Sequence, residues 1–194
     1  MVSATQGEYP DTRATGLSYN TAGYVETVED ALEQITNLGY DAAGRITQIV
    51  RPDSEQITLG YDADGRVTSV TPPGKPAHTF TYTPAGLLDT YTPPDIGLGV
   101  TSTQYTYNAD KQITRINRPD GLTPTFSYDA GGRLQTLQLQ RGTLEYAYDP
   151  ATGLLQSITD PDGGVLSFTY DGRLPTGSTW TGEVEGSVSR TYDE

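Results

Sequence analysis

The sequence predicts an all-β fold, an antiparallel meander of repeated β-hairpins that forms one long curved sheet. Three observations predict it. A short motif, Tyr-Asp-x-x-Gly-Arg followed by an apolar residue, returns at a nearly constant interval. The residues before each tyrosine alternate between aromatic or apolar and small polar types, which is the period of a β-strand. Gly (22 residues) and Pro (13 residues) return with the motif, so they indicate turns rather than disorder.

Nine tyrosines mark the repeat. Successive ones are 20 to 25 residues apart, most often 21. A period this regular indicates an array of one supersecondary unit, in which each copy is supported by its neighbours. The tyrosines are Tyr19, Tyr40, Tyr61, Tyr82, Tyr107, Tyr128, Tyr148, Tyr170 and Tyr192.

Three copies keep the whole motif. We expect the tyrosine, aspartate, glycine and arginine of each copy to shape its hairpin. The aspartate can accept hydrogen bonds from the backbone that follows it, and the glycine can adopt the positive φ that ends such a turn. The aspartate and arginine of one copy are expected to pair within or between hairpins. These structural residues are Tyr40, Asp41, Gly44, Arg45, Tyr61, Asp62, Gly65, Arg66, Tyr128, Asp129, Gly132 and Arg133.

A second turn follows about half a period later. It is marked by Pro, Asp and Gly, as in Arg118-Pro119-Asp120-Gly121 and Asp160-Pro161-Asp162-Gly163. One repeat is therefore one hairpin, and nine repeats give about 17 strands, or on the order of 80 Å of sheet at about 4.8 Å per strand. Open twisted sheets rarely exceed about 10 strands, so the sheet is expected to coil.

The chain divides, in this interpretation, into three segments. Residues 1–18 are an irregular lead-in, in which Glu8–Pro10 and Leu17–Tyr19 could form a first strand pair. Residues 19–174 are the hairpin array, with a longer loop over 92–99. Residues 175–194 are an irregular repeat followed by the truncated start of the next one, which suggests a piece of a longer array.

One segment has conflicting signals. Glu26–Ile35 has the propensity of a short helix, but its place in the repeat is that of the second turn. We predict strand, turn and strand there. Along the return strands, apolar residues lie three apart, as in Ile46 and Ile49, which requires a bulge or a strand end if both are to share a face. The repeated tyrosines are expected to stack as a ladder along one face.

Composition excludes several classes of function. The net charge of −13 argues against a nucleic-acid-binding or anionic-membrane surface. There is no cysteine, so disulfides and thiolate metal sites are excluded. No apolar run is long enough to cross a membrane, and the N-terminus lacks the pattern of a signal peptide. Hydrophobic residues make up only 34%, which is little for a two-layer core.

Residues that could carry chemistry are few. Asp62-x-Asp64-Gly65 resembles the start of a calcium loop, but no acid follows at the right place, so we interpret it as a turn. His78 is the only histidine and is expected to be a solvated strand residue. No cofactor, metal or catalytic set is predicted. Trp180 is the only tryptophan; it could contact a sugar, although a packing role is the simpler interpretation.

The motif and its period resemble the YD repeat of the Rhs family, which includes bacterial polymorphic toxins, the C component of insecticidal Tc toxins, wall-associated proteins and teneurins. The resemblance runs from about Tyr19 to Asp193. It implies a β-sheet ribbon that spirals into a hollow shell, which in the toxins encloses a C-terminal effector domain. The segment from Tyr148 to Leu155 is also similar to the element at which Rhs cores cleave themselves, but here we interpret it as a variant turn.

The expected function is that of a non-catalytic shell segment of a secreted or cell-surface protein. Its partners would be further YD repeats of the same parent chain and an enclosed effector, without nucleic acid and without membrane insertion. An alternative is a module that binds carbohydrate or a cell-surface partner through the tyrosine-lined face. An autoprotease acting near Asp149 is the weakest alternative. Free edge strands are expected to favour edge-to-edge self-association.

Overall fold

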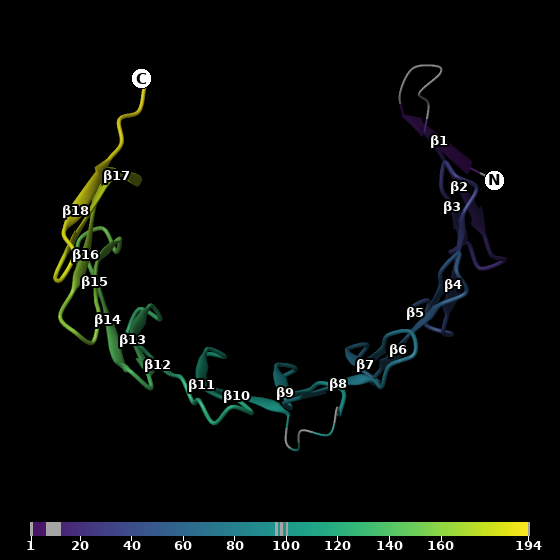
Figure 1. Ribbon diagram of the computed structural model, residues 1–194, viewed down its shortest axis with the longest axis horizontal. Coiled ribbons are helices and arrows are strands. Elements are labelled where there is room, and N and C mark those ends of the chain that lie inside the picture. Colours follow the sequence, from purple (N-terminus) through teal and green to yellow (C-terminus); the bar gives the residue numbers. More distant parts are fainter. Residues whose placement is uncertain (1, 7–12, 96, 98, 100, 194) are drawn as a thin grey trace. The chain divides into compact units, whose positions relative to one another are not determined.

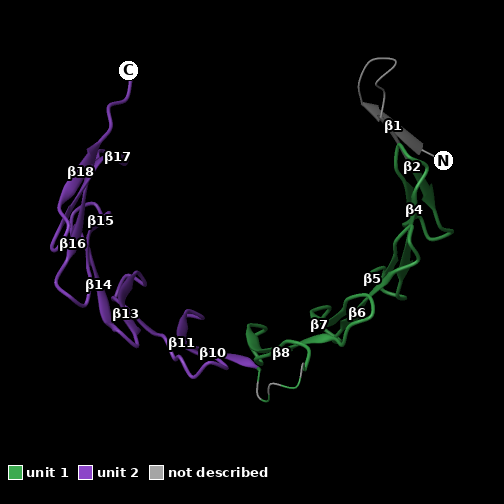
Figure 2. Ribbon diagram, viewed as in Figure 1, with its two compact units in different colours: residues 1–101 green, residues 102–194 purple. Residues whose placement is uncertain are grey.

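The computed structural model describes residues 2–6, 13–95, 97, 99 and 101–193, and every element in these ranges is a β-strand (Figure 1). The fold is therefore all-β and antiparallel, as predicted. No helix that could span a membrane occurs among the described residues. The chain forms two compact units, residues 1–101 and 102–194 (Figure 2).

The first unit is an antiparallel meander in which each strand pairs with the next along the chain. Leu17–Tyr19, predicted as part of a first strand pair, lies in a strand that pairs on both sides; Glu8–Pro10 lies outside the described residues. Its strands are β1 (Val2–Gln6), β2 (Arg13–Tyr19), β3 (Val25–Glu29), β4 (Ile35–Tyr40), β5 (Ile46–Val50), β6 (Gln56–Tyr61), β7 (Val67–Thr71), β8 (His78–Tyr82) and β9 (Leu88–Thr92).

The second unit repeats the same meander topology. Its strands are β10 (Thr103–Tyr107), β11 (Ile113–Asn117), β12 (Thr125–Tyr128), β13 (Leu134–Leu139), β14 (Gly142–Tyr148), β15 (Leu155–Thr159), β16 (Val165–Asp171), β17 (Leu174–Thr181) and β18 (Gly186–Ser189). The described residues thus contain 18 strands, close to the expected 17.

The segment with helical propensity is strand, turn and strand, as its place in the repeat predicted. Val25–Glu29 and Ile35–Tyr40 are β3 and β4, and the turn between them is capped by Asp30. The Asp30 carboxylate accepts hydrogen bonds from the backbone N–H of Leu32 at 2.8 Å and of Gln34 at 3.0 Å. Sheet pairing and this cap therefore outweigh the local preference for helix.

Most turns of both kinds share one hydrogen-bond pattern. In the first kind, the Asp41 N–H donates to the Arg45 carbonyl and the Gly44 N–H donates to the Asp41 carbonyl, each at 3.0 Å. In the second kind, Asp160, Gly163 and Gly164 repeat this arrangement at 2.8 and 3.1 Å. The fourth residue has a positive φ, which glycine adopts without strain. Non-glycine residues occupy that position at Glu33, Ser54 and Lys111, with φ of 62°, 66° and 64°.

A bulge places the apolar residues of each return strand on one face. Leu38 pairs with Ile49 and Tyr40 pairs with Ile46, so the register shifts by one residue between them. Ile46 and Ile49 therefore lie on the same face although they are three apart in sequence. The same shift precedes Tyr19, Tyr61, Tyr82, Tyr107, Tyr128, Tyr148 and Tyr170.

The sheet has one apolar face and one polar face. The cross-strand row Leu38, Ile49 and Ile57 lies on the apolar face, and the neighbouring row Gln48 and Thr58 lies on the polar face. Each unit is a single layer of strands (Figure 2), and no hydrophobic residue is buried among those whose exposure the structure describes. The apolar side chains are only half-buried, so the fold has no core of the usual two-layer kind.

The positive φ positions give a direct test of the turn geometry. Gly65 has φ of 84°, and a Cβ built there would meet only Arg45 Nη1, at 3.5 Å, so Gly65→Ala introduces backbone strain without a clash. We expect it to lower the free energy of unfolding by about 1–2 kcal/mol. Lys111→Gly relieves backbone strain in the folded state but raises the conformational entropy of the unfolded chain. It should therefore change the free energy of unfolding by less than about 0.5 kcal/mol. Urea denaturation of both variants checks this asymmetry, and equal losses would contradict it.

Candidate functional site

The aspartate of the motif closes the turn that follows it. The Asp62 Oδ1 atom accepts hydrogen bonds from the backbone N–H of Asp64 at 3.0 Å and of Arg66 at 2.9 Å. Asp41 and Asp129 make the same pair of contacts at 2.9–3.0 Å. A short carboxylate is suited to this position because it reaches the backbone two and four residues on without interrupting the strand before it.

The second oxygen of each aspartate holds the arginine of the same motif. The Arg45 Nε donates to Asp41 Oδ2 at 2.8 Å, and the Arg66 and Arg133 Nε atoms donate to Asp62 and Asp129 at 2.7 Å. The predicted Asp–Arg pairs are thus formed, within each hairpin. The same carboxylate fixes the turn with one oxygen and the guanidinium with the other, so the arginine leaves the turn in a defined direction.

Each of these arginines crosses to the next hairpin. The guanidinium carbon of Arg45 lies 4.7 Å from the ring centre of Tyr61, which begins the following motif. Arg66 lies 5.0 Å from the Tyr82 ring, and Arg133 lies 4.5 Å from the Tyr148 ring. Arg45 Nη1 also donates to the Asp62 carbonyl at 3.1 Å. A guanidinium over an aromatic face is attractive because the ring presents negative charge there.

The tyrosine completes the connection through its hydroxyl. Tyr61 donates a hydrogen bond of 2.7 Å to the Ile46 carbonyl, at the start of the return strand of the preceding hairpin. The same bond, 2.7–2.9 Å long, joins Tyr40 to Val25, Tyr82 to Val67, Tyr128 to Ile113, Tyr148 to Leu134, Tyr170 to Leu155 and Tyr192 to Pro175. We call the Asp–Arg pair of one repeat, together with the tyrosine of the next, the repeat clamp.

The predicted ladder of stacked tyrosines is wrong. Among the described residues, the stacked rings are Tyr24 with Tyr40 and Tyr91 with both His78 and Phe80. In the complete motifs an arginine lies against the tyrosine ring instead. The physical reason is the spacing: successive motif tyrosines are two strands apart, about 9–10 Å, which is too far for direct stacking and leaves room for a guanidinium.

One repeat achieves the clamp without charge. Asn108 and Gln112 stand where the motif has aspartate and arginine. Asn108 Oδ1 accepts from the Gln112 N–H at 2.9 Å, and its amide donates to Gln112 Oε1 at 2.9 Å. Gln112 Nε2 then donates to the Gly132 carbonyl in the next hairpin at 2.6 Å. The sequence alone did not identify this amide pair, although its position in the repeat was a sufficient signal.

The environment of the motif aspartates lowers their pKa. For Asp41 and Asp129 the main cause is the backbone N–H of Arg45 or Arg133, followed by the hydrogen bond from the same arginine's side chain. For Asp62 the backbone N–H of Arg66 is again the largest cause, opposed by desolvation and aided by the Arg66 side chain. The pKa of Arg66 is raised, chiefly by the hydrogen bond to Asp62.

The other candidate residues have structural surroundings. Asp62 and Asp64 both bind Arg66, so the segment that resembled a calcium loop is a turn closed on a guanidinium. His78 lies on strand β8 as expected, but it is half-buried and its Nδ1 is 2.8 Å from the Tyr91 hydroxyl, so the expectation of a solvated residue is wrong. No group of three or more metal-ligating side chains is found in the part of the chain that the structure describes.

Asp149 occupies the variant turn. Its Oδ1 accepts hydrogen bonds from the N–H of Ala151 at 3.0 Å, the N–H of Thr152 at 2.7 Å and the Thr152 hydroxyl at 2.8 Å. These contacts, the Thr152 side chain first, lower the pKa of Asp149. A carboxylate held ionised in this way is a turn cap.

The lowered pKa values predict how stability depends on pH. Because the folded pKa of Asp62 lies below its ordinary value of 3.8, its contacts stabilise the fold fully above pH 3.8. That contribution declines as the pH falls below 3.8 and is lost below the folded pKa. Asp62→Asn keeps the turn contacts, as Asn20 and Asn108 do, but removes the charge. It should therefore melt below wild type at pH 7, and the difference should shrink as the pH falls below 3.8.

Thermal melts between pH 7 and pH 2 check this, with Asp110→Asn as the matched control. Asp110 is an exposed carboxylate in the turn between β10 and β11. A melting-temperature difference between Asp62→Asn and wild type that stays constant across this range would contradict the assignment.

Comparison with known proteins identifies the family. The family model described as Teneurin YD-shell matches residues 2–194. No curated protein sequence matches the chain significantly. Among solved structures, the crystal structure of TcdB2-TccC3 is similar with a TM-score of 0.71 and 15% sequence identity, and the TcdB2-TccC3-Cdc42 structure with 0.71 and 16%. A TcdB2-TccC3 structure without its hypervariable C-terminal region gives 0.70 and 15%.

These likenesses cover 91% of this chain and 12% of each solved chain, so the present chain spans about an eighth of their length. At such low identity they show the fold alone. The family model, in contrast, covers nearly the whole sequence, and the repeated hairpins with their Tyr-Asp-x-x-Gly-Arg turns are the features expected of such a shell. This chain therefore belongs to the Teneurin YD-shell family.

Proposed function

We propose that this chain is a wall segment of a YD shell in a secreted or cell-surface protein, and that the shell encloses a C-terminal effector domain. The observation that carries the proposal is the single-layered sheet whose hairpins are joined by repeat clamps. Such a sheet has no core of its own, and its contacts serve to continue the array from one hairpin to the next. That is the property a wall needs.

The two faces suggest which side of the wall is inside. One face carries the cross-strand apolar rows, and the other carries mainly Ser, Thr and Gln. A large apolar surface facing solvent would promote association between molecules. In a closed shell, the apolar face would therefore be turned toward the enclosed space and the polar face toward water.

One of the similar structures suggests that the parent protein of this chain carries a cargo domain. One similar structure is of TcdB2-TccC3 without a hypervariable C-terminal region, so that protein carries a variable segment at its C-terminus. By analogy, the parent of this chain would carry an effector after its repeats. Within this proposal residues 1–18 are a lead-in and residues 19–174 are the array. Residues 175–194 are an irregular repeat and the start of the next one, and Tyr192 donates to the Pro175 carbonyl as the other motif tyrosines donate to their partners.

The role proposed here is non-catalytic. The motif carboxylates are engaged with backbone N–H groups and with arginine, and Asp149 caps its turn. The recurring polar groups of the array are thus used to hold the hairpins. Edge-to-edge association of copies remains part of the proposal, because the outer strands β1 and β18 each pair with one neighbour in their unit.

The experiment tests whether the clamps keep the wall closed. In a complete shell that contains these repeats, Arg45→Ala, Arg66→Ala and Arg133→Ala together should expose the effector to trypsin, because three hairpin junctions lose their bridging guanidinium. The matched control is Arg51→Ala with Arg118→Ala, since these arginines pair only with an acid of their own turn. We expect the effector to stay protected in wild type and control and to be digested in the triple variant.

The appearance of effector fragments is followed by mass spectrometry. Effector that is digested equally fast in wild type and in the triple variant would contradict enclosure.

A further inference from the structure

The last residue of each motif turn decides what covers the next motif tyrosine. In the three complete motifs this residue is arginine, and its guanidinium carbon lies 4.5–5.0 Å from the centre of the following tyrosine ring. In the first repeat Tyr24 takes the arginine's place and stacks on Tyr40, with the ring centres 5.0 Å apart. The space over the ring is therefore filled from the preceding turn in these repeats.

In the turn after β14 this position is held by Leu154. The Asp149 N–H donates to the Leu154 carbonyl at 2.8 Å, as the Asp129 N–H donates to the Arg133 carbonyl at 2.9 Å. Leu154 is thus the counterpart of Arg133, although its turn is one residue longer. Leucine has neither a donor for the carboxylate nor a charge for the ring. Of the arginines that the structure describes, none lies over the ring of Tyr170, the next motif tyrosine.

The carboxylate of Asp149 keeps one oxygen for a partner. Its Oδ1 atom accepts three hydrogen bonds from its own turn. Its Oδ2 atom, the counterpart of the Asp129 oxygen that holds the Arg133 Nε at 2.7 Å, has no hydrogen-bond partner among the described residues. Hydrogen bonds from Thr152 are the main cause of the lowered pKa of Asp149. The carboxylate is therefore ionised at neutral pH without a cation beside it.

A depression of about 350 Å³ lies where the guanidinium is missing. Asp149, Leu154, Tyr170 and Gly172 line it. A Cβ added to the glycine of the turn that follows a complete motif would lie 3.3–3.5 Å from the Nη1 atom of that motif's arginine. One added to Gly172, in the shortened turn after Tyr170, would meet nothing within 4 Å. The place that an arginine fills in the complete motifs is open here.

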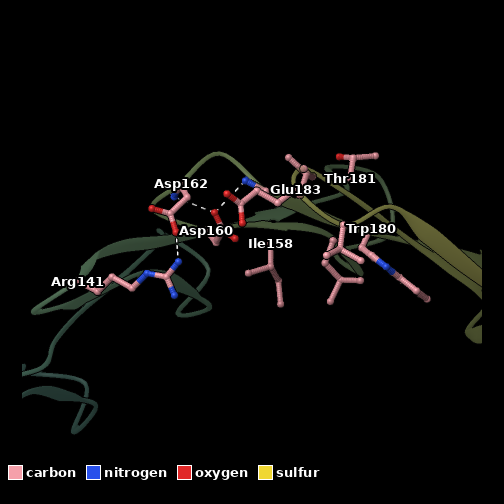
Figure 3. A pocket seen from close by; sticks show the side chains of 12 residues that line it. Arg141, Ile158, Asp160, Asp162, Trp180, Thr181 and Glu183 are labelled. Atoms are coloured by element: carbon pink, nitrogen blue, oxygen red, sulfur yellow. Dashed lines mark hydrogen bonds and ion pairs between the residues drawn. The ribbon is translucent and has the colours of Figure 1, made fainter.

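Another depression of this unit lies at the opposite edge of the sheet, by the turns after β13, β15 and β17 (Figure 3). There Arg141 points toward Asp162 and pairs with it, so the chain itself supplies the guanidinium. The Trp180 indole is directed away from the acidic side chains and lies against Gly186, where an added Cβ would be 2.4 Å from Cζ2. Asp149 differs from Asp162 because its carboxylate borders a depression without an arginine of its own.

We infer that the depression between Asp149 and Tyr170 binds the arginine side chain of a partner polypeptide. The guanidinium lies over the Tyr170 ring and donates to Asp149 Oδ2, in the arrangement that Arg133 has one repeat earlier. Its aliphatic stem packs against Leu154. The inference concerns these hairpins alone and holds whether or not the shell is closed.

Arginine fits this place better than lysine does. Its planar guanidinium can stack on an aromatic ring and donate to a carboxylate at the same time, whereas an ammonium is a compact, strongly hydrated charge. The three complete motifs show that the same carboxylate and ring geometry takes a guanidinium in this protein.

Nuclear magnetic resonance of the purified chain tests the inference, with acetyl-arginine-amide as the probe for a peptide arginine. We expect saturable shifts of the Leu154 and Gly172 backbone amides. Acetyl-lysine-amide should bind about threefold more weakly, because an ammonium stacks less well on the ring. Acetyl-citrulline-amide has nearly the same shape as the arginine probe but no charge, and it should give no saturable shift.

One substitution removes the charge of the site. Asp149→Asn keeps an acceptor for the turn, as Asn20 and Asn108 do in theirs, and should weaken binding of the arginine probe about tenfold. The matched control is Asp160→Asn, the same change in an aspartate that caps a turn at the opposite edge (Figure 3). This control should bind the probe as wild type does.

Two further substitutions fill the site and copy it. Leu154→Arg supplies the guanidinium from the chain itself, so it should raise the melting temperature and abolish binding of the probe. Arg133→Leu opens the same place over Tyr148 and should create a second site, seen as saturable shifts of the Gly153 amide. The melting temperature of each variant shows that it is folded under the conditions of the titration.

The inference is overturned if the arginine probe gives no saturable shift, or if the lysine or citrulline probe binds as tightly. It is also overturned if Leu154→Arg still binds the probe as wild type does, or if Asp149→Asn and Asp160→Asn weaken binding equally.

Discussion

The repeat clamp is the interaction on which the rest of the structure depends. One aspartate closes its own turn with one oxygen and orients an arginine with the other. The arginine then lies on the tyrosine of the next hairpin, and that tyrosine bonds back to the preceding return strand. Local turn chemistry thus becomes contact between repeats. In the three complete motifs the carboxylate, the guanidinium and the next tyrosine contact one another, so these residues act together.

This arrangement explains how a sheet without buried residues can be ordered. In a two-layer domain, apolar burial supplies most of the stabilisation. Here none of the apolar side chains whose exposure is described is fully buried, and each hairpin contacts only its sequence neighbours within a unit. Stability should then be a sum of hairpin and junction contributions, as in other repeat proteins. The polar clamps matter more in such a sheet, because less hydrophobic burial is available to compensate for their loss.

The local features could be predicted from sequence, whereas contacts between repeats could not. Asp62 and Gly65 identified a turn because their backbone preferences act within a few residues. The phase of the repeat correctly placed a turn within Glu26–Ile35 against helix propensity. The tyrosine's partner was missed, because Ile46 lies 15 residues before Tyr61 and comes close to it only through the pairing of β5 with β6.

Close approaches between turns were unpredictable for the same reason. Gly142 lies against Pro161 and Gly182 lies against Gly164, and the sequence shows only that glycines are present. The predicted ladder of tyrosines is wrong because successive motif tyrosines lie two strands apart. An arginine side chain fits into that distance. The residue types of a repeat therefore predict the hairpin itself, whereas the contacts between hairpins follow from the strand register.

Hydrogen exchange of Tyr61→Phe tests the central claim most directly. The variant removes only the hydroxyl that joins Tyr61 to the Ile46 carbonyl. If the clamp couples neighbouring repeats, backbone amides of both the β4–β5 and the β6–β7 hairpins should exchange faster than in wild type. The control is Tyr146→Phe, which changes a strand tyrosine outside the motif and should leave exchange unchanged. Faster exchange confined to the β6–β7 hairpin, or equal effects of the two variants, would contradict coupling through the tyrosine.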